Sequence, residues 1–287
     1  GCWIQTAPMP TLPPLWALHG RPLRPACLRP DIPRWNLPFT RFNVPIGRNI
    51  PMFETFAALL LAHVLADFAL QTKAMVDRKG QASVLALHGA VVLVTAVIAL
   101  GAWHPALLWL ALLHLLIDLA KTRVRHGLAA FLVDQAAHLL TIAALALWLP
   151  DLWAQGLWAG VSQAPGLMLL VAGALMATRA GGFAVGLLMA PFSAATPDGL
   201  PGGGRVIGLL ERGLIFALVL LGQPEGVGLL LAAKSILRFG AVKDDRAASE
   251  YVIIGTLASV GWALLVAYAT QSLLVALPPL GISSVTP

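Results

Sequence analysis

The sequence predicts an all-α integral membrane protein: a polytopic transmembrane helical bundle of about eight membrane helices, preceded by a disordered Pro/Arg-rich N-terminal extension. Hydrophobic residues make up 58% of its 287 residues and charged residues only 11%, whereas a soluble domain carries about 25% charged residues. Runs of about 20 apolar residues, the length that spans a hydrocarbon core, recur between Phe53 and Leu274. Because these runs lack period-two alternation, helices are favoured over a β-barrel.

Residues 1–51 differ in composition from the rest of the chain. They hold 11 of the 21 prolines and six arginines, and proline at this density prevents regular helices and strands. They also hold both cysteines, Cys2 and Cys27, so neither a disulfide framework nor a thiolate metal site is supported. Because Met52 directly precedes the first apolar helix, we interpret Met52 as the true start and the extension as a gene-model artefact. A genuine basic, proline-rich arm is the alternative.

Eight apolar segments are long enough to span a bilayer or nearly so. Four of them lie in a first half of the chain, residues 52–150, and four in a second half, residues 151–287. The predicted segments are 53–73, 82–101, 105–121, 128–149, 166–190, 205–222, 226–239 and 250–274.

Basic residues are found in alternate connections between these segments. Lys and Arg occur in the loops 73–82 and 121–127 and again after residue 239, whereas the intervening loops carry none. By the positive-inside rule we expect the basic loops in the cytoplasm and the chain in a bacterial inner membrane. The net charge of +6 is then a topology signal rather than a nucleic-acid footprint. The expected partner is the lipid bilayer, and the sequence specifies no protein partner.

Histidine and aspartate recur inside the first four segments, where ionisable groups are costly. In the first and third segments, which run inward, a His precedes an Asp by four residues, so both lie on one helical face. In the fourth segment, which runs outward, the Asp comes first. All three aspartates therefore fall in one layer and the histidines in another. We predict four metal ligands and three carboxylates acting as ligands or general bases; these are His63, His88, His114 and His138, with Asp67, Asp118 and Asp134.

This combination of side chains predicts a site for a divalent transition metal such as zinc, manganese or iron. Four His and three Asp suffice for one ion with its supporting groups, or for two ions. A bound metal lowers the pKa of a water molecule to about 7 and polarises a phosphoryl or carbonyl oxygen. Proton handling by the same groups is a second interpretation. A third is simple hydrogen bonding between helices, at about 0.6 kcal/mol per contact.

A second group of charges lies in the last three segments. We predict Arg212, Lys234 and Arg238 as an anion-binding set, with Glu211 and Glu250 as counter-charges in structural ion pairs. The alternative is an internal ion-pair network whose ends reach the membrane interface. Arg179, midway through the fifth segment, has no assigned role, and the adjacent Gly181-Gly182 predicts a helix break there.

These motifs resemble a family of bacterial multi-pass membrane proteins known only as domain of unknown function 3307. The resemblance extends over about residues 53–265 and implies a membrane protein without an established activity. It rests on His63-x-x-x-Asp67-Phe68-x-x-Gln71-Thr72, His114-x-x-x-Asp118-x-x-Lys121, Asp134-Gln135-x-x-His138, Gly208-x-x-Glu211-Arg212, Lys234-Ser235-x-x-Arg238-Phe239 and Glu250-Tyr251-x-x-x-Gly255-Thr256.

Three functions are compatible with this pattern. The first is a metal-dependent hydrolase that acts at the cytoplasmic face on a lipid-linked or phosphorylated substrate. The second is a transporter for a metal ion or protons, which requires a polar path to the outer face. The outer halves of the first four segments are almost wholly apolar, which counts against transport. The third is a non-catalytic membrane scaffold.

Overall fold

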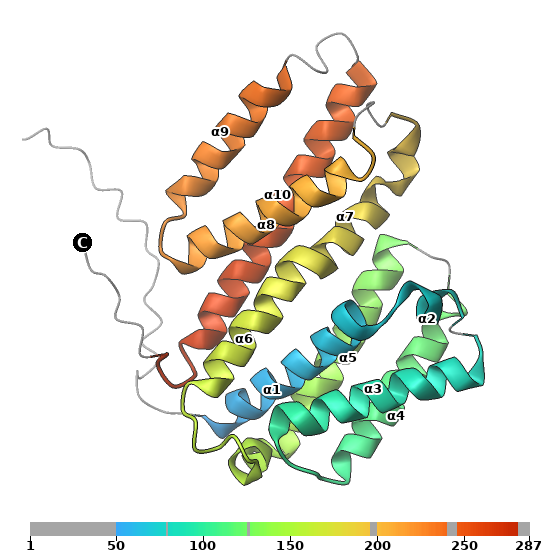
Figure 1. The fold of residues 1–287 in the computed structure, drawn as a ribbon, viewed down its shortest axis with the longest axis vertical. Coiled ribbons are helices and arrows are strands. Elements are labelled where there is room, and N and C mark those ends of the chain that lie inside the picture. The colour runs from blue at the N-terminus through green and yellow to red at the C-terminus, as the bar shows by residue number, and fades with distance from the viewer. Residues whose placement is uncertain (1–49, 79, 125–126, 196–199, 240–245, 281–287) are drawn as a thin grey trace, which may run out of the picture. The chain divides into compact units, whose positions relative to one another are not determined.

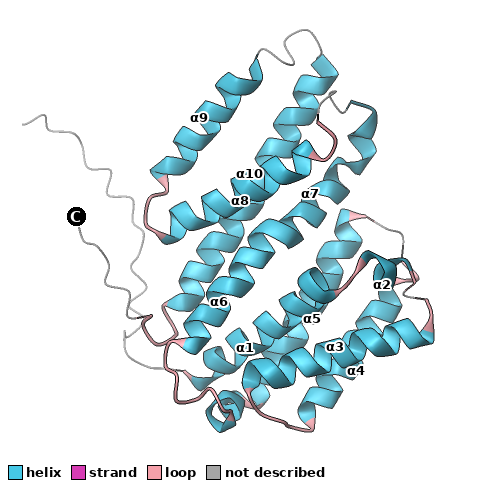
Figure 2. Cartoon of the chain, viewed as in Figure 1, coloured by secondary structure: helices cyan, strands magenta, loops and turns pink. Residues whose placement is uncertain are grey.

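The computed structural model describes residues 50–78, 80–124, 127–195, 200–239 and 246–280 (Figure 1). Within these ranges all regular structure is helical and there is no strand (Figure 2), which confirms the all-α class. The predicted extension lies outside the described residues apart from Ile50 and Pro51, so its disorder stays a prediction.

The first half forms five α-helices. The first of them, α1, begins at a proline, which suits the first helical position because its missing N–H needs no partner there. A glycine in the left-handed conformation, Gly101 with φ 66°, ends α3. The elements are α1 (Pro51–Leu65), the π-helical turn η2 (Ala66–Leu70), α2 (Lys73–Asp77), α3 (Ala82–Leu100), α4 (Ala106–Lys121) and α5 (Leu128–Trp148).

The second half adds five longer helices and three short helical turns. Gly202, with φ 75°, provides the left-handed residue from which α8 starts. The elements are η3 (Pro150–Gln155), α6 (Ala164–Leu175), the π-helical turn η4 (Met176–Ala180), α7 (Gly181–Met189), η5 (Ala190–Ala195), α8 (Gly203–Leu220), α9 (Glu225–Phe239) and α10 (Arg246–Leu274).

Five helical stretches among the described residues are long and apolar enough to cross a membrane, and they identify a membrane protein. They are Pro51–Leu70, Ala82–Leu100, Leu128–Trp148, Ala164–Ala194 and Arg246–Leu274. The other three predicted segments also form helices, but α4 has only 16 residues, α9 has 15, and α8 contains Arg205, Glu211 and Arg212. Eight spans therefore stay a prediction.

Helix α1 is the element around which the first half packs. It contacts α3, α5, α6 and η3 (Figure 1). Small side chains on its buried surface, such as Ala57, Ala58 and Ala62, are at most 2% exposed and allow neighbouring helix backbones to approach closely. The buried hydroxyl of Thr55 donates to Pro150 O at 2.7 Å and accepts from Trp153 N at 3.1 Å. These bonds hold η3 against the start of α1.

The described residues include two π-helical turns, η2 at the end of α1 and η4 between α6 and α7. The turn η4 lies where the sequence predicts a break, but the helix continues through it into α7. The carbonyls of this turn are bonded by side chains: Trp262 Nε1 donates to Met176 O at 2.9 Å and Arg212 Nη2 donates to Thr178 O at 2.9 Å. The expected break is wrong because these donors stabilise a bulge instead. Such turns are frequent at functional sites, and η2 contains Asp67.

Candidate metal centre

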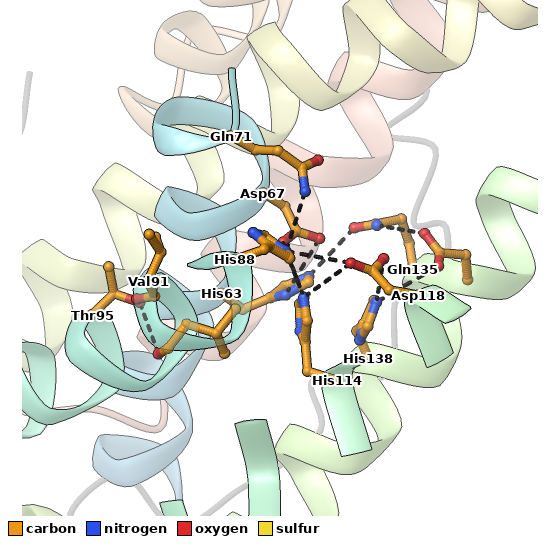
Figure 3. Close-up of polar contacts among 12 residues, drawn as sticks. His63, Asp67, Gln71, His88, Val91, Thr95, His114, Asp118, Gln135 and His138 are labelled. Carbon is orange, nitrogen blue, oxygen red and sulfur yellow. Dashed lines mark hydrogen bonds and ion pairs between the residues drawn. The ribbon is translucent and has the colours of Figure 1, made fainter. Parts of the chain in front are cut away.

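The seven His and Asp side chains predicted as ligands converge in the interior of the first half (Figure 3). They come from α1, η2, α3, α4 and α5, and none of the side chains is more than 8% exposed. The spacing of four residues within α4 and α5 and between α1 and η2 places each His–Asp pair on the inward face of its helix. We call these seven residues the His/Asp cluster.

Three ligand atoms form the tightest part of the cluster. His88 Nε2 lies 3.1 Å from His114 Nε2, and Asp67 Oδ1 lies 3.3 Å from the former and 3.2 Å from the latter. Ligands that bind one ion at about 2.1 Å are themselves roughly 3.0 to 3.4 Å apart in octahedral or tetrahedral geometry. Asp67, His88 and His114, the first triad, therefore match the separation that a metal ion requires.

A second triad consists of Asp118, Asp134 and His138. His138 Nε2 lies 3.6 Å from Asp134 Oδ1 and 3.9 Å from Asp118 Oδ1, so this triad is looser than the first. The other oxygen of Asp134 is held in place by Lys121 Nζ at 2.5 Å and by Gln135 Nε2 at 3.1 Å. These two donors orient the remaining oxygen, Oδ1, toward His138.

His63 lies beside both triads. Its ring nitrogen Nε2 is 3.4 Å from Gln135 Oε1, and Nδ1 is 3.8 Å from Asp67 Oδ2. It also forms a third possible ligand group with His114 and His138. The rings of His114 and His138 are stacked, with centroids 4.0 Å apart.

Several of these buried polar atoms have no hydrogen-bond partner. They are His63 Nδ1, Asp67 Oδ1, His88 Nδ1, Asp134 Oδ1 and both ring nitrogens of His138. The ring nitrogen to carboxylate distances given above are short enough for ion pairs, but these atoms lack the directional geometry of a hydrogen bond. A buried polar atom without a partner costs about 1–3 kcal/mol, and bound cations would bind the acceptors in this set, which are Asp67 Oδ1, Asp134 Oδ1 and one ring nitrogen of His138. The cluster can therefore hold a metal ion, and hydrogen bonding between helices alone accounts for it less well.

The surroundings of the cluster are asymmetric. At one end lie Gln71, whose Nε2 is 3.2 Å from His88 Nε2, and Lys121, which is 30% exposed and ends α4. At the other end a cavity of about 10 Å³, room for about one water molecule, is enclosed by the imidazoles and apolar side chains. Beyond it lies a dry core that includes Leu59, Leu100 and Leu107, each at most 1% exposed. The cluster thus has a polar end, bordered by Gln71 and Lys121, and an apolar end on the opposite side.

The charged residues predicted in the second half, where their side chains are described, each have a bonding partner within the protein. Lys234 Nζ donates to both oxygens of Glu211 at 2.7 and 2.8 Å. Arg212 donates from Nη1 to Ser259 Oγ at 3.2 Å and from Nη2 to Thr178 O at 2.9 Å. Glu250 pairs with Arg246 at 2.9 Å on an exposed stretch of α10. The side chain of Arg238 lies outside the described part of the chain.

Four polar residues next to the cluster had no predicted role. Gln71, Lys121 and Gln135 contact the His/Asp cluster directly. Their sequence signal is spacing: Gln71 follows Asp67 by one helical turn, and Lys121 follows Asp118 by three residues. Arg179 in η4 donates from Nη1 to Phe68 O at 3.1 Å. Because Phe68 directly follows Asp67, this bond brings a cation close to the His/Asp cluster. No local pattern predicts this contact, because it joins two π-helical turns 111 positions apart.

The cluster lies within a segment that has relatives. Residues 55–157 match the family model described as protein of unknown function (DUF3307). This match confirms the predicted resemblance for these residues and includes every member of the His/Asp cluster, whereas the second-half motifs lie beyond it. No curated protein and no solved structure matches the chain.

Proposed function

We propose that this chain is a metal-dependent membrane hydrolase that acts at the cytoplasmic face on a phosphorylated or lipid-linked substrate. The observation that carries the proposal is the His/Asp cluster with its unsatisfied ligand atoms, bordered by Gln71 and Lys121 at one end and by apolar residues at the other. The proposal places the protein in a bacterial inner membrane with its basic loops in the cytoplasm.

Each part of the cluster has a role in this proposal. His63, His88, His114 and His138 hold a divalent ion such as zinc, manganese or iron, and the aspartates either complete its coordination or accept a proton from the attacking water. When bound, such an ion supplies an activated water and polarises the scissile phosphoryl or carbonyl oxygen. Lys121 and Gln135 keep Asp134 oriented. The apolar core beneath the histidines limits solvent access from the other side.

The charges near the polar end of the cluster favour an anionic substrate. Arg179 is exposed, and among the described residues its only hydrogen bond is the one to Phe68 O, beside Asp67. It is the cation we propose to contact a phosphate first. Lys234 and Arg212, the cations expected from sequence, would have to give up Glu211 and the Thr178 carbonyl to bind an anion.

The two alternative functions receive less support. Transport of an ion or proton needs polar groups from one face to the other, but the part of the first half beyond the histidines is an apolar core. A scaffold needs polar side chains that satisfy one another, but six buried atoms of the cluster have no hydrogen-bond partner among the described residues.

The direct test is elemental analysis of the full chain purified in detergent, together with hydrolysis assays on phospholipid and lipid-phosphate substrates. We expect bound transition metal in the wild type, loss of metal and activity in His114→Ala, and neither loss in His104→Ala. His104 is a matched control because it lies outside the cluster, where its Nδ1 accepts a hydrogen bond from Ala106 N. Absence of metal after growth with added zinc, manganese and iron would overturn the proposal.

A further inference from the structure

We infer that the His/Asp cluster is a two-metal centre and that its substrate carries a phosphate group. This inference rests on the proposed function, because it requires that the cluster binds metal. It goes further by assigning one ion to each triad and by naming the chemical group that the pair of ions receives.

The first step is that the two triads share no residue. Asp67, His88 and His114 supply three ligand atoms for one ion, and a separate set of three comes from the second triad. One ion bound by a single triad would leave the three buried ligand atoms of the other triad without an ion. That other triad would then include at least one carboxylate oxygen without a partner, Asp67 Oδ1 or Asp134 Oδ1.

The second step is that Asp118 lies between the triads. Its Oδ2 is 3.4 Å from His88 Nε2 of the first triad, whereas its Oδ1 is 3.9 Å from His138 Nε2 of the second. The side chain is only 1% exposed. A carboxylate whose two oxygens face different ligand sets is suited to bridge two ions, and two-metal hydrolytic sites hold their ions about 3.5–4 Å apart.

The third step is the charge of the site. With neutral histidines, the three carboxylates and Lys121 carry a formal charge of −2, which one divalent ion neutralises. A second ion leaves the site at +2. Buried charge without compensation is unfavourable, so the two-ion form favours a dianionic ligand. A phosphate monoester has this charge, and its oxygens can bridge two metal ions.

The distances also predict an order of binding. The ligand atoms of the first triad are already 3.1–3.3 Å apart, whereas those measured in the second are 3.6 and 3.9 Å apart and must close around an ion. We therefore expect the first ion to bind tightly at Asp67, His88 and His114. The second ion binds more weakly at Asp118, Asp134 and His138.

The test is a Mn²⁺ titration of the full chain, stripped with a chelator in detergent and followed by calorimetry and electron paramagnetic resonance. We expect two ions per chain, at least about tenfold apart in affinity, and a spin-coupled pair at saturation. His88→Ala removes the tight step and His138→Ala the weak one, each leaving one uncoupled ion, whereas His104→Ala keeps both. The wild-type stoichiometry and spin coupling decide the matter even if a variant does not fold.

Inorganic phosphate then tests the ligand. We expect it to change the spectrum of the wild type at two ions per chain and not that of His138→Ala. The same measurement with phosphatidic acid in mixed micelles and with a soluble phosphate monoester distinguishes a lipid phosphate from a soluble one as the ligand. If the wild type binds a single ion and both His88→Ala and His138→Ala lose it, the two-metal centre is overturned but the proposed function stands. No ion at all overturns both, and two ions without a response to any phosphate probe overturns the phosphate assignment.

Discussion

At the scale of single residues, Asp134 is the member of the cluster with the clearest support from its neighbours. Its side chain is 3% exposed, and Lys121 Nζ binds its Oδ2 at 2.5 Å. Lys121→Met would leave a buried carboxylate without its cation, so we expect the metal-free protein to lose about 1–3 kcal/mol of stability. Thermal unfolding in detergent with a chelator measures this change.

A double-mutant cycle separates the interaction between Lys121 and Asp134 from other effects of the Lys121→Met substitution. Asp134→Asn in the Lys121→Met background should restore much of the lost stability, because it removes the uncompensated charge. Lys73→Met, a substitution at an exposed lysine at the start of α2, is the matched control and should have little effect. Additive effects of the two substitutions in the cycle would show that Lys121 and Asp134 do not stabilise each other.

The residues of the cluster were predictable for a specific physical reason. A His and an Asp four residues apart must share a helical face, and an ionisable group within an apolar helix must point toward the protein interior. The supporting contacts were not predictable in this way. Gln135 bonds both Asp134 and His63, and the second bond depends on how α1 and α5 pack, which spacing within one helix does not specify.

At the scale of elements, the π-helical turn η4 is held open by side chains from other helices. A methyl group built on Gly181 would lie 2.5 Å from Trp262 Cδ1 and 3.0 Å from Arg212 Cδ. These are the side chains that bond the carbonyls of η4. We therefore expect Gly181→Ala to lower stability by about 1–3 kcal/mol through overpacking, measured as a lower unfolding temperature in detergent.

Gly186→Ala on the same helix α7 is the control for this prediction. Nothing lies within 4 Å of the position of its added methyl group, and alanine favours a helix over glycine by up to about 1 kcal/mol. This variant should be neutral or stabilised. If Gly181→Ala and Gly186→Ala had the same unfolding temperature, η4 would not be sensitive to the side chains packed against it.

The helices themselves were largely predictable, whereas the π-helical turns were not. All eight predicted segments form helices, because long apolar runs bounded by Gly, Pro and charged residues leave few other structures in a membrane. A π-helical turn requires donors for the carbonyls it frees. For η4 those donors are Arg212 and Trp262, which are 34 and 86 positions away from the carbonyls they bond, so no local pattern near Gly181-Gly182 indicates them.

At the scale of the whole molecule, the number of membrane crossings in the first half depends on α4. Its 16 residues span about 24 Å, whereas a hydrocarbon core is about 30 Å thick. Trp103 before the helix and Lys121 at its end are suited to make up this difference at the interfaces. The contact between His88 near the start of α3 and Asp118 near the end of α4 brings these two helix ends together. Two adjacent antiparallel crossings therefore explain the cluster better than one.

Cysteine labelling tests this arrangement in intact cells. In a background with Cys2→Ser and Cys27→Ser, single cysteines at Gln81, Thr122 and Ala159 mark exposed positions before α3, after α4 and after α5. If α3, α4 and α5 all cross the membrane and the basic loops are cytoplasmic, a membrane-impermeant maleimide should label only the Ala159 position until the cells are made permeable. Labelling of Gln81→Cys and Thr122→Cys from opposite sides would mean that α4 does not cross. Labelling of both from outside would invert the topology and move the polar end of the His/Asp cluster, with the substrate proposed to bind there, to the outer face.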